Sequence, residues 1–194
     1  MERDDISQIV YDKNVIDFVA VAAEFCHFLE NEAEPTRSEW VDRMLKLLPL
    51  LYVKALLLPV TEELNDEFPP TFVREEDYAR VASRIAELMG EEDIYLDVFV
   101  EEMKYSERPI SAFVSENMAD LYQDIRNFVS VYQFELKEQM LYALTTCRET
   151  FYLYWGQKLV NVLRPLHTLK CRDEESSIEN DNDIENINRE ELWD

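Results

Sequence analysis

Glycine is nearly absent from this chain: only Gly90 and Gly156 occur among 194 residues, where average usage of about 7% would supply roughly a dozen. Phosphate-binding loops and tight hairpin turns need residues that tolerate positive φ. Neither G-x-G-x-x-G nor G-x-x-x-x-G-K can be written with two glycines so far apart, so the commonest nucleotide-binding loops are excluded. The scarcity of glycine predicts long helices joined by loops that contain none.

Histidine and cysteine are also scarce, which limits the chemistry open to the chain. The histidines are His27 and His167, and the cysteines are Cys26, Cys147 and Cys171. An odd number of distant cysteines, two of them on apolar helical stripes, favours free thiols over disulfide bridges and suits a reducing cytoplasm. With so few histidines, no Ser-His or Cys-His pair is indicated, and hydrolysis by a catalytic triad is not expected.

Signals for secretion and membrane insertion are missing. The acidic segment at residues 1–5 is not a positive region followed by an apolar one, so we expect no secretory signal. The longest apolar run, residues 47–59, contains Pro49 and Lys54 and is shorter than the ~20 residues that a spanning helix needs. We therefore expect a cytoplasmic protein without a membrane segment.

Positively charged residues are few relative to acidic ones. The net charge is −23, which opposes binding to nucleic acid and to anionic lipid, so neither is expected as a partner. Residues 172–194 hold ten acidic and two basic residues, a net charge of −8, leaving −15 for the other 171 residues. This composition predicts a flexible acidic tail with a weak helical turn near its end. Its apolar pair, Leu192 and Trp193, either docks on a partner or has no role.

Apolar residues recur every three or four positions along most of the chain, which predicts amphipathic helices. The strongest run indicates a helix packed at a small crossing angle; it comprises Val114, Met118, Leu121, Ile125, Phe128 and Tyr132. The last helix is longer, and its inward face comprises Met140, Leu144, Cys147, Phe151, Trp155, Leu159, Val162 and Leu166. A first helix is predicted over about residues 13–30, and its inward face comprises Val15, Val19, Ala22, Cys26 and Leu29.

Capping residues and helix breakers indicate where other helices begin and end. Thr36 and Glu39 match a capping box, so a second helix begins there, and Pro49 predicts a kink or a restart within it. Another helix runs from about Arg74 to Gly90, which stands where a left-handed C-cap is expected.

Two segments lack a helical pattern. Residues 59–70 are polar, end in two prolines and are predicted to form a loop. Residues 94–99 alternate as a strand does, but no partner strand is evident, so we expect an extended loop or an irregular helix. The predicted fold is all-α: a single-domain bundle of about five to seven helices over residues 1–171, with a kinked second helix and the acidic tail at residues 172–194.

One pair of residues has the spacing of a metal-binding motif. Glu24 and His27 form a Glu-x-x-His step, the unit that two helices of a di-iron bundle each contribute. A second copy is missing, because Arg164 stands three residues before His167. A helix-surface Glu and His is therefore favoured over a metal site, and no cofactor is expected.

Three acidic residues lie one helical turn apart. Glu116, Asp120 and Asp124 share a stripe beside the apolar face of their helix. Such a stripe is usually a solvated face. Where helices flank it, it can instead bind a hard cation or take arginine partners.

Four short segments carry a resemblance to a known family: residues 11–19, 95–99, 119–126 and 151–160. Together they resemble domain of unknown function 5063, a bacterial family, over residues 8–168. The resemblance implies a helical cytoplasmic protein without an assigned activity, and it supplies no catalytic residue.

The resemblance favours five residues as the first candidates for a binding site: Asp120, Tyr122, Asp124, Tyr154 and Trp155. Tyr154 stands where a histidine is expected before Trp-Gly, and this departure weakens a metal or acid-base role. Gly156 inside a helix indicates the close approach of a neighbouring helix. Across that contact, Asp124 would reach the indole of Trp155 or the hydroxyl of Tyr154.

Two functions fit these observations. The first is a non-enzymatic module that binds a protein partner, favoured by the acidity, the lack of catalytic clusters and the Leu-Trp pair in the tail; a variant is a mimic of nucleic acid that competes for basic surfaces. The second is a binding protein for a small molecule or divalent cation, with hydrolysis as an option, that uses the carboxylate stripe or Glu24 and His27. The sequence leaves the partner, the ligand and the oligomeric state open.

Overall fold

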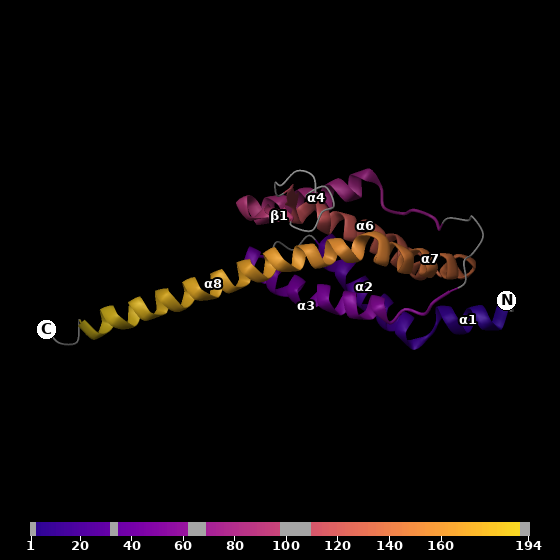
Figure 1. Cartoon of the computed structure of the whole chain (residues 1–194), viewed down its shortest axis with the longest axis horizontal. Helices are drawn as coiled ribbons and strands as arrows, with labels where there is room; N and C mark the ends of the chain where they lie inside the picture. The colour runs from indigo at the N-terminus through magenta and orange to yellow at the C-terminus, as the bar shows by residue number, and fades with distance from the viewer. Residues whose placement is uncertain (1–2, 32–34, 62–68, 98–109, 191–194) are drawn as a thin grey trace.

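Long helices account for most of the chain (Figure 1). The structure, a computed structural model, describes residues 3–31, 35–61, 69–97 and 110–190, and the side chains of residues 6–175 within these ranges. In chain order the elements are α1 (Arg3–Val10), α2 (Lys13–Glu30), α3 (Arg37–Leu56), α4 (Glu75–Met89), the 3-10 turn η1 (Gly90–Asp93), β1 (Ile94–Asp97), β2 (Ile110–Phe113), α6 (Val114–Gln133), α7 (Lys137–Thr150), the π-helical turn η2 (Phe151–Trp155) and α8 (Gly156–Glu190). The predicted all-α bundle is confirmed.

Helix α6 lies at the centre of the bundle. It packs against α2, α4, α7 and α8. Its predicted inward face is confirmed, since Tyr132 is half-buried and the other members are buried: Val114, Met118, Leu121, Ile125 and Phe128. Burial of each large apolar side chain stabilises the fold by about 1.5–3 kcal/mol, which makes α6 the main support of the core.

Helices α2 and α3 begin where capping chemistry predicts. The Asp12 carboxylate accepts a hydrogen bond from the Asn14 N–H at 2.8 Å. The Thr36 hydroxyl accepts from the Glu39 N–H at 3.3 Å, and the Glu39 carboxylate accepts from the Thr36 N–H at 2.8 Å, so the predicted capping box is present. Pro49 lies inside α3, which continues beyond it as one helix and does not restart.

The expectation of a loop or irregular helix at residues 94–99 is wrong for the part that the structure describes. Strand β1 pairs antiparallel with β2, with Ile94 opposite Phe113. A two-stranded ribbon is only marginally stable alone, but this one is tied to the bundle. Buried Asp93 accepts hydrogen bonds of 2.7 Å from both the N–H and the hydroxyl of Ser115, in the first turn of α6, where a carboxylate is favoured.

Helices α7 and α8 are joined through η2 into one continuous helix, and its eight predicted inward residues are all buried. The Gly156 N–H donates to the carbonyl of Phe151, the i→i+5 bond of a π turn. A Cβ at Gly156 would lie 2.9 Å from two ring carbons of Phe151 and closer still to its carbonyl oxygen. The π turn of the helix itself therefore requires glycine at position 156. The expectation that a neighbouring helix explains this glycine is wrong.

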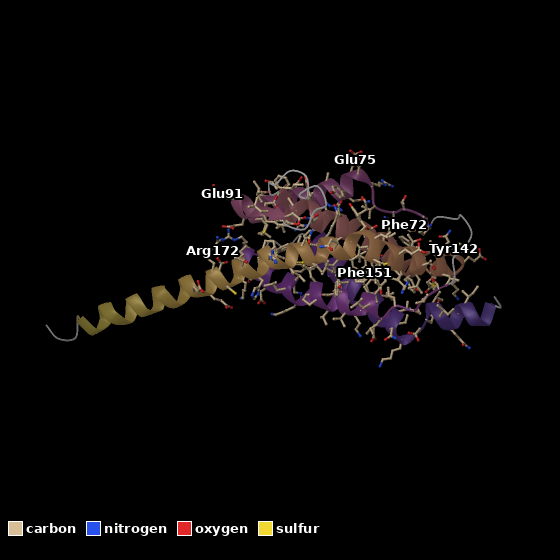
Figure 2. All side chains as sticks on the ribbon, in the orientation of Figure 1. Phe72, Glu75, Glu91, Tyr142, Phe151 and Arg172 are labelled. Atoms are coloured by element: carbon tan, nitrogen blue, oxygen red, sulfur yellow. The ribbon has the colours of Figure 1, made fainter. Side chains whose placement is uncertain are left out.

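Helix α8 continues past the predicted end of the domain. The backbone of residues 172–190 is helical and projects away from the bundle (Figure 1), whereas the sequence predicted a tail with one weak turn. Arg172 donates to Glu92 at 2.5 Å where α8 passes the end of α4 (Figure 2). The domain boundary and the flexibility of the tail stay predictions, and Leu192 and Trp193 lie outside the described residues.

The three cysteines are free thiols, as predicted. Cys26 and Cys147 are buried in the core. Burial raises the pKa of both thiols, so both stay protonated and unreactive near neutral pH.

Candidate functional site

Asp120 and Tyr154 are brought together by a lysine. The Asp120 carboxylate pairs with Lys158 of α8 and accepts a hydrogen bond from the Tyr78 hydroxyl of α4 at 3.1 Å. The Lys158 ammonium also lies 4.4 Å from the ring centroid of Tyr154, a cation–π distance. Although burial opposes the charge of Lys158, its hydrogen bond to Asp120 raises its pKa. Asp120 thus joins α4, α6 and α8, and its charge is already compensated.

Asp124, one turn later on α6, lies in a different environment. It is half-buried in a cavity of about 230 Å³ between α6, α7 and the segment at residues 69–71. Within the part of the chain that the structure describes, no group donates a hydrogen bond to its carboxylate. Burial, followed by the neighbouring charge of Asp120, raises the pKa of Asp124 from 3.8 to about 6. A carboxylate of this kind can bind a cation or exchange a proton near neutral pH.

The predicted bond from Asp124 to Trp155 or Tyr154 is wrong. The Trp155 indole donates instead to the carbonyl of Cys147 at 3.1 Å. Trp155 is completely buried, with its ring 4.7 Å from that of Phe151 and 6.3 Å from that of Phe18. Trp155 thus belongs to the predicted inward face of the helix, whereas Tyr154, one position earlier, is directed toward Lys158.

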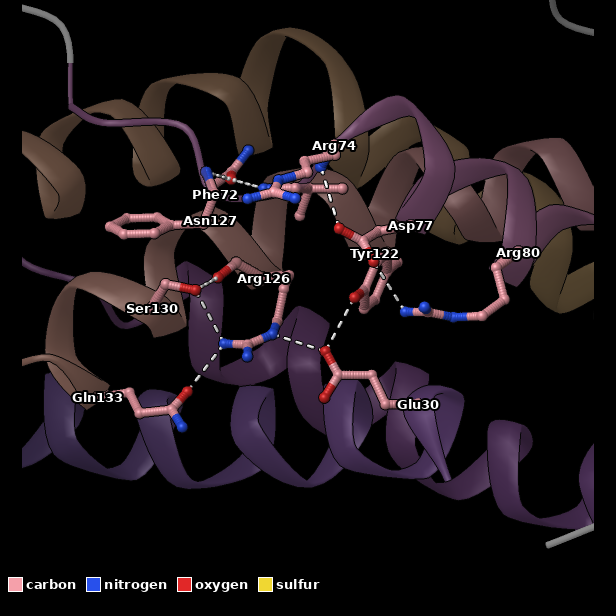
Figure 3. Close-up of polar contacts among 11 residues, drawn as sticks. Glu30, Phe72, Arg74, Asp77, Arg80, Tyr122, Arg126, Asn127, Ser130 and Gln133 are labelled. Carbon is pink, nitrogen blue, oxygen red and sulfur yellow. Dashed lines mark hydrogen bonds and ion pairs between the residues drawn. The ribbon is translucent and has the colours of Figure 1, made fainter. Parts of the chain in front are cut away.

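Tyr122 lies on the opposite side of α6 from Asp124 and belongs to a polar network (Figure 3). Its hydroxyl donates to the Glu30 carboxylate, at the end of α2, at 2.8 Å. The Arg126 Nε donates to the same oxygen of Glu30 at 2.6 Å. Arg126 also donates to the Ser130 hydroxyl at 2.8 Å and to the Gln133 side-chain carbonyl at 3.0 Å. The guanidinium is therefore held in one orientation.

A cavity of about 390 Å³ opens beside this network. Glu30 and Arg126 form one wall, and Arg80, which pairs with Asp77 at 2.9 Å, forms another. Residues Phe72 and Phe134, with ring centroids 5.5 Å apart, complete the lining. Tyr122 was among the predicted site residues, but its partners were not. The signal available was the polar spacing on α6, because Tyr122, Arg126 and Ser130 lie one turn apart.

Glu24 and His27 do not converge on a common point. Glu24 pairs with Arg43 of α3, and His27 is exposed. Glu116, the first member of the acidic stripe, is exposed as well. Among residues 6–31, 35–61, 69–97 and 110–175, no three His, Cys, Asp or Glu side chains are grouped so as to hold a metal ion.

The second half of α3 and the four residues that follow it expose an unusual number of aliphatic side chains. We call these residues the α3 apolar face; their exposed fractions are 46–76%, and they are Leu50, Val53, Leu56, Leu57 and Val60. Leu51 and Ala55 of the same helix are buried, and so is Leu58, just after its end. The aliphatic residues of this stretch therefore contribute both to the core and to the exposed surface. In the described part of the chain, no helix has the length and apolarity required to cross a membrane.

Comparison with known proteins gives a family and a solved structure. A family model described as "Domain of unknown function (DUF5063)" matches residues 9–172. The crystal structure of protein BF1032 from Bacteroides fragilis is similar, with a TM-score of 0.73 and 47% sequence identity over 84% of this chain and 96% of that chain. No curated protein matches. Neither description names a ligand, a partner or an activity.

Proposed function

Because this chain belongs to the DUF5063 family, whose description assigns no function, we propose from its geometry that it is a non-enzymatic interaction module. Its protein partner binds the α3 apolar face. The observation that carries this proposal is the exposure of five large aliphatic side chains within residues 50–60 of a chain that contains 42 acidic residues.

The exposure and spacing of these residues support a binding role. A single exposed leucine is ordinary, whereas a contiguous apolar patch marks an interaction site in soluble proteins. Removing such surface from water stabilises a complex by about 25 cal/mol for each Å² buried. Residues at positions 50, 53 and 57 follow the i, i+3, i+7 spacing of a helical contact surface.

The negative charge of the chain favours a positively charged partner. Within residues 47–60 the only charged side chain is Lys54, and it is paired with Asp17 at 2.7 Å. A second copy of this chain would bring a further charge of −23, which opposes self-association. The face therefore suits a basic amphipathic helix, whose apolar side meets α3 while its lysines or arginines are attracted by the net negative charge of the chain.

A synthetic helix tests this proposal directly. The probe is a fluorescent peptide of about 18 residues of leucine and lysine, arranged as an amphipathic helix. We expect saturable binding that the double substitution Val53→Ser and Leu57→Ser weakens at least about tenfold. The matched control is Leu96→Ser, which removes an aliphatic side chain of 58% exposure from β1, and it should bind as the original chain does.

Three results would contradict the proposal. Binding that is unchanged in the α3 variant would show that charge alone attracts the peptide, and binding that is equally weakened in the Leu96 variant would show apolar contact that is not specific to α3. Equal binding of an acidic amphipathic peptide would overturn the choice of a basic partner. Binding to neutral phosphatidylcholine vesicles that disappears in the α3 variant would assign the face to a lipid surface.

A second candidate function is the binding of a small molecule, and the position of Asp124 favours it. This carboxylate faces a cavity rather than open water, unlike Glu116 on the same stripe. The divalent-cation version of this function is not favoured, because the described lining contributes only one carboxylate, and Mg²⁺ or Ca²⁺ sites draw on several oxygen ligands.

A further inference from the structure

We propose that the Asp124 cavity binds a small organic cation, whose ammonium or amidinium group is held by the Asp124 carboxylate. The inference rests on the second candidate function and specifies its ligand class. It is independent of the α3 apolar face.

Two carboxylates of α6 differ in their partners. Asp120 is compensated by Lys158 and by the Tyr78 hydroxyl. Asp124 is half-buried yet receives no hydrogen bond from the described residues. Since a partly buried charge is costly unless it is paired, a cationic ligand would supply the missing partner.

Hydrogen-bond acceptors in the cavity wall favour a ligand that donates. The Thr150 hydroxyl lines the cavity and donates to the Cys147 carbonyl at 3.3 Å. Its proton is therefore committed, and toward a ligand its oxygen can only accept. Asp124 and Thr150 thus both suit a ligand that donates hydrogen bonds.

The charge and size of the cavity also limit the class of ligand. Lys158, whose charge acts on Asp124, is already paired with Asp120. No cationic side chain lines the described cavity, and the chain carries −23, so an anionic ligand would be repelled. The volume of about 230 Å³ is below the ~300–1,000 Å³ of pockets for drug-sized ligands. Phe128 and Ala143 supply apolar wall, so the ligand is a short aliphatic or small aromatic cation.

Three probes of equal chain length separate charge from shape: n-butylamine, 1-butanol and butyrate. Each is titrated into isotopically labelled full-length protein at pH 8, and binding is read from NMR shifts of residues around the cavity, such as Thr146 and Thr150. We expect the amine to bind at least about tenfold more tightly than the alcohol and butyrate not to bind. Asp124→Asn should abolish the preference for the amine, whereas Glu116→Gln, which removes a charge from an exposed site on the same helix, should preserve it.

The outcomes distinguish failure of the ligand class from failure of the site. If the alcohol binds as tightly as the amine, a small-molecule cavity remains but the cation is wrong. If no probe shifts the cavity residues, the second candidate function fails with it. If Asp124→Asn and Glu116→Gln weaken amine binding equally, the amine responds to the general negative field and the site is refuted. None of these results affects the peptide experiment on α3.

Discussion

At the scale of single residues, burial and partners decide what an acidic side chain does. Asp120 and Asp124 have the same chemistry and lie one turn apart on α6, but α4 and α8 provide Asp120 with a hydroxyl and an ammonium. Asp124 faces a cavity and receives neither. The first residue therefore supports the bundle, whereas the second weakens it when ionised and is available to a ligand.

The pH dependence of stability tests this assignment. The pKa of Asp124 is about 6 in the folded state, raised from the usual 3.8 by burial and by Asp120. Between these values the folded state binds more protons than the unfolded state, so stability falls as the pH rises through this window. Asp124→Asn removes the ionisable group. We expect it to raise the free energy of unfolding by about 1–2 kcal/mol at pH 8 and to have little effect at pH 4.

Urea unfolding at both pH values measures this difference, with Glu116→Gln as the control for lost charge. Glu116 is exposed, so its substitution should change the free energy of unfolding by less than about 0.5 kcal/mol at either pH. A loss of stability in Asp124→Asn at pH 8 would mean that the ionised carboxylate has a stabilising partner, contrary to this description.

The candidate site was only partly predictable from sequence. Helical spacing places Asp120 and Asp124 on one side of α6 and Tyr122 on the other, and the structure agrees. The partners could not be predicted, because Lys158 and Glu30 are separated from Asp120 and Tyr122 by 38 and 92 positions. Periodicity shows which side of a helix is polar, but the packing of distant helices determines what that side meets.

At the scale of elements, local patterns predict regular helices well and their irregularities poorly. The capping box of α3, the inward face of α6 and the positive φ of 59° at Gly90 follow from short-range rules. The β1–β2 ribbon was missed because its second strand is four residues long and lacks clear alternation. The π turn was missed because its i→i+5 bond leaves the three-and-four spacing of the core residues intact.

Substitution of Gly156 tests the role of this turn. In a regular helix Gly→Ala is stabilising by about 0.5–1 kcal/mol. Here the added Cβ would collide with the carbonyl and ring of Phe151, so we expect Gly156→Ala to lower the free energy of unfolding by about 1–3 kcal/mol. The control is Val160→Ala, one turn later on α8 at an exposed position, with an expected change within about 0.5 kcal/mol. Denaturant unfolding of both variants distinguishes the collision from helix propensity, and a stabilised Gly156→Ala would refute it.

At the scale of the whole molecule, acidic residues are unevenly distributed along the chain. The α3 apolar face lies in a stretch without acidic residues, whereas residues 172–194 carry a net charge of −8. Helix α8 connects the core to this acidic segment (Figure 1). Its last buried residues are Leu166 and Leu169, and Arg172 then pairs with Glu92. The described contacts hold α8 to the bundle as far as Asp173, which pairs with Arg37 of α3 at 4.0 Å.

Shortening the chain locates the end of the domain. A protein that ends at Glu175 retains Leu166, Leu169 and the Arg172–Glu92 pair and loses seven acidic residues and one basic residue. We expect its Tm in calorimetry to lie within about 2 °C of that of the full chain. A protein that ends at Leu163 also loses the two buried leucines, worth roughly 3–6 kcal/mol, and should melt at least about 10 °C lower. A similar fall in the longer protein would mean that residues 176–194 pack on the bundle, and the domain would then extend past the boundary predicted at residue 171.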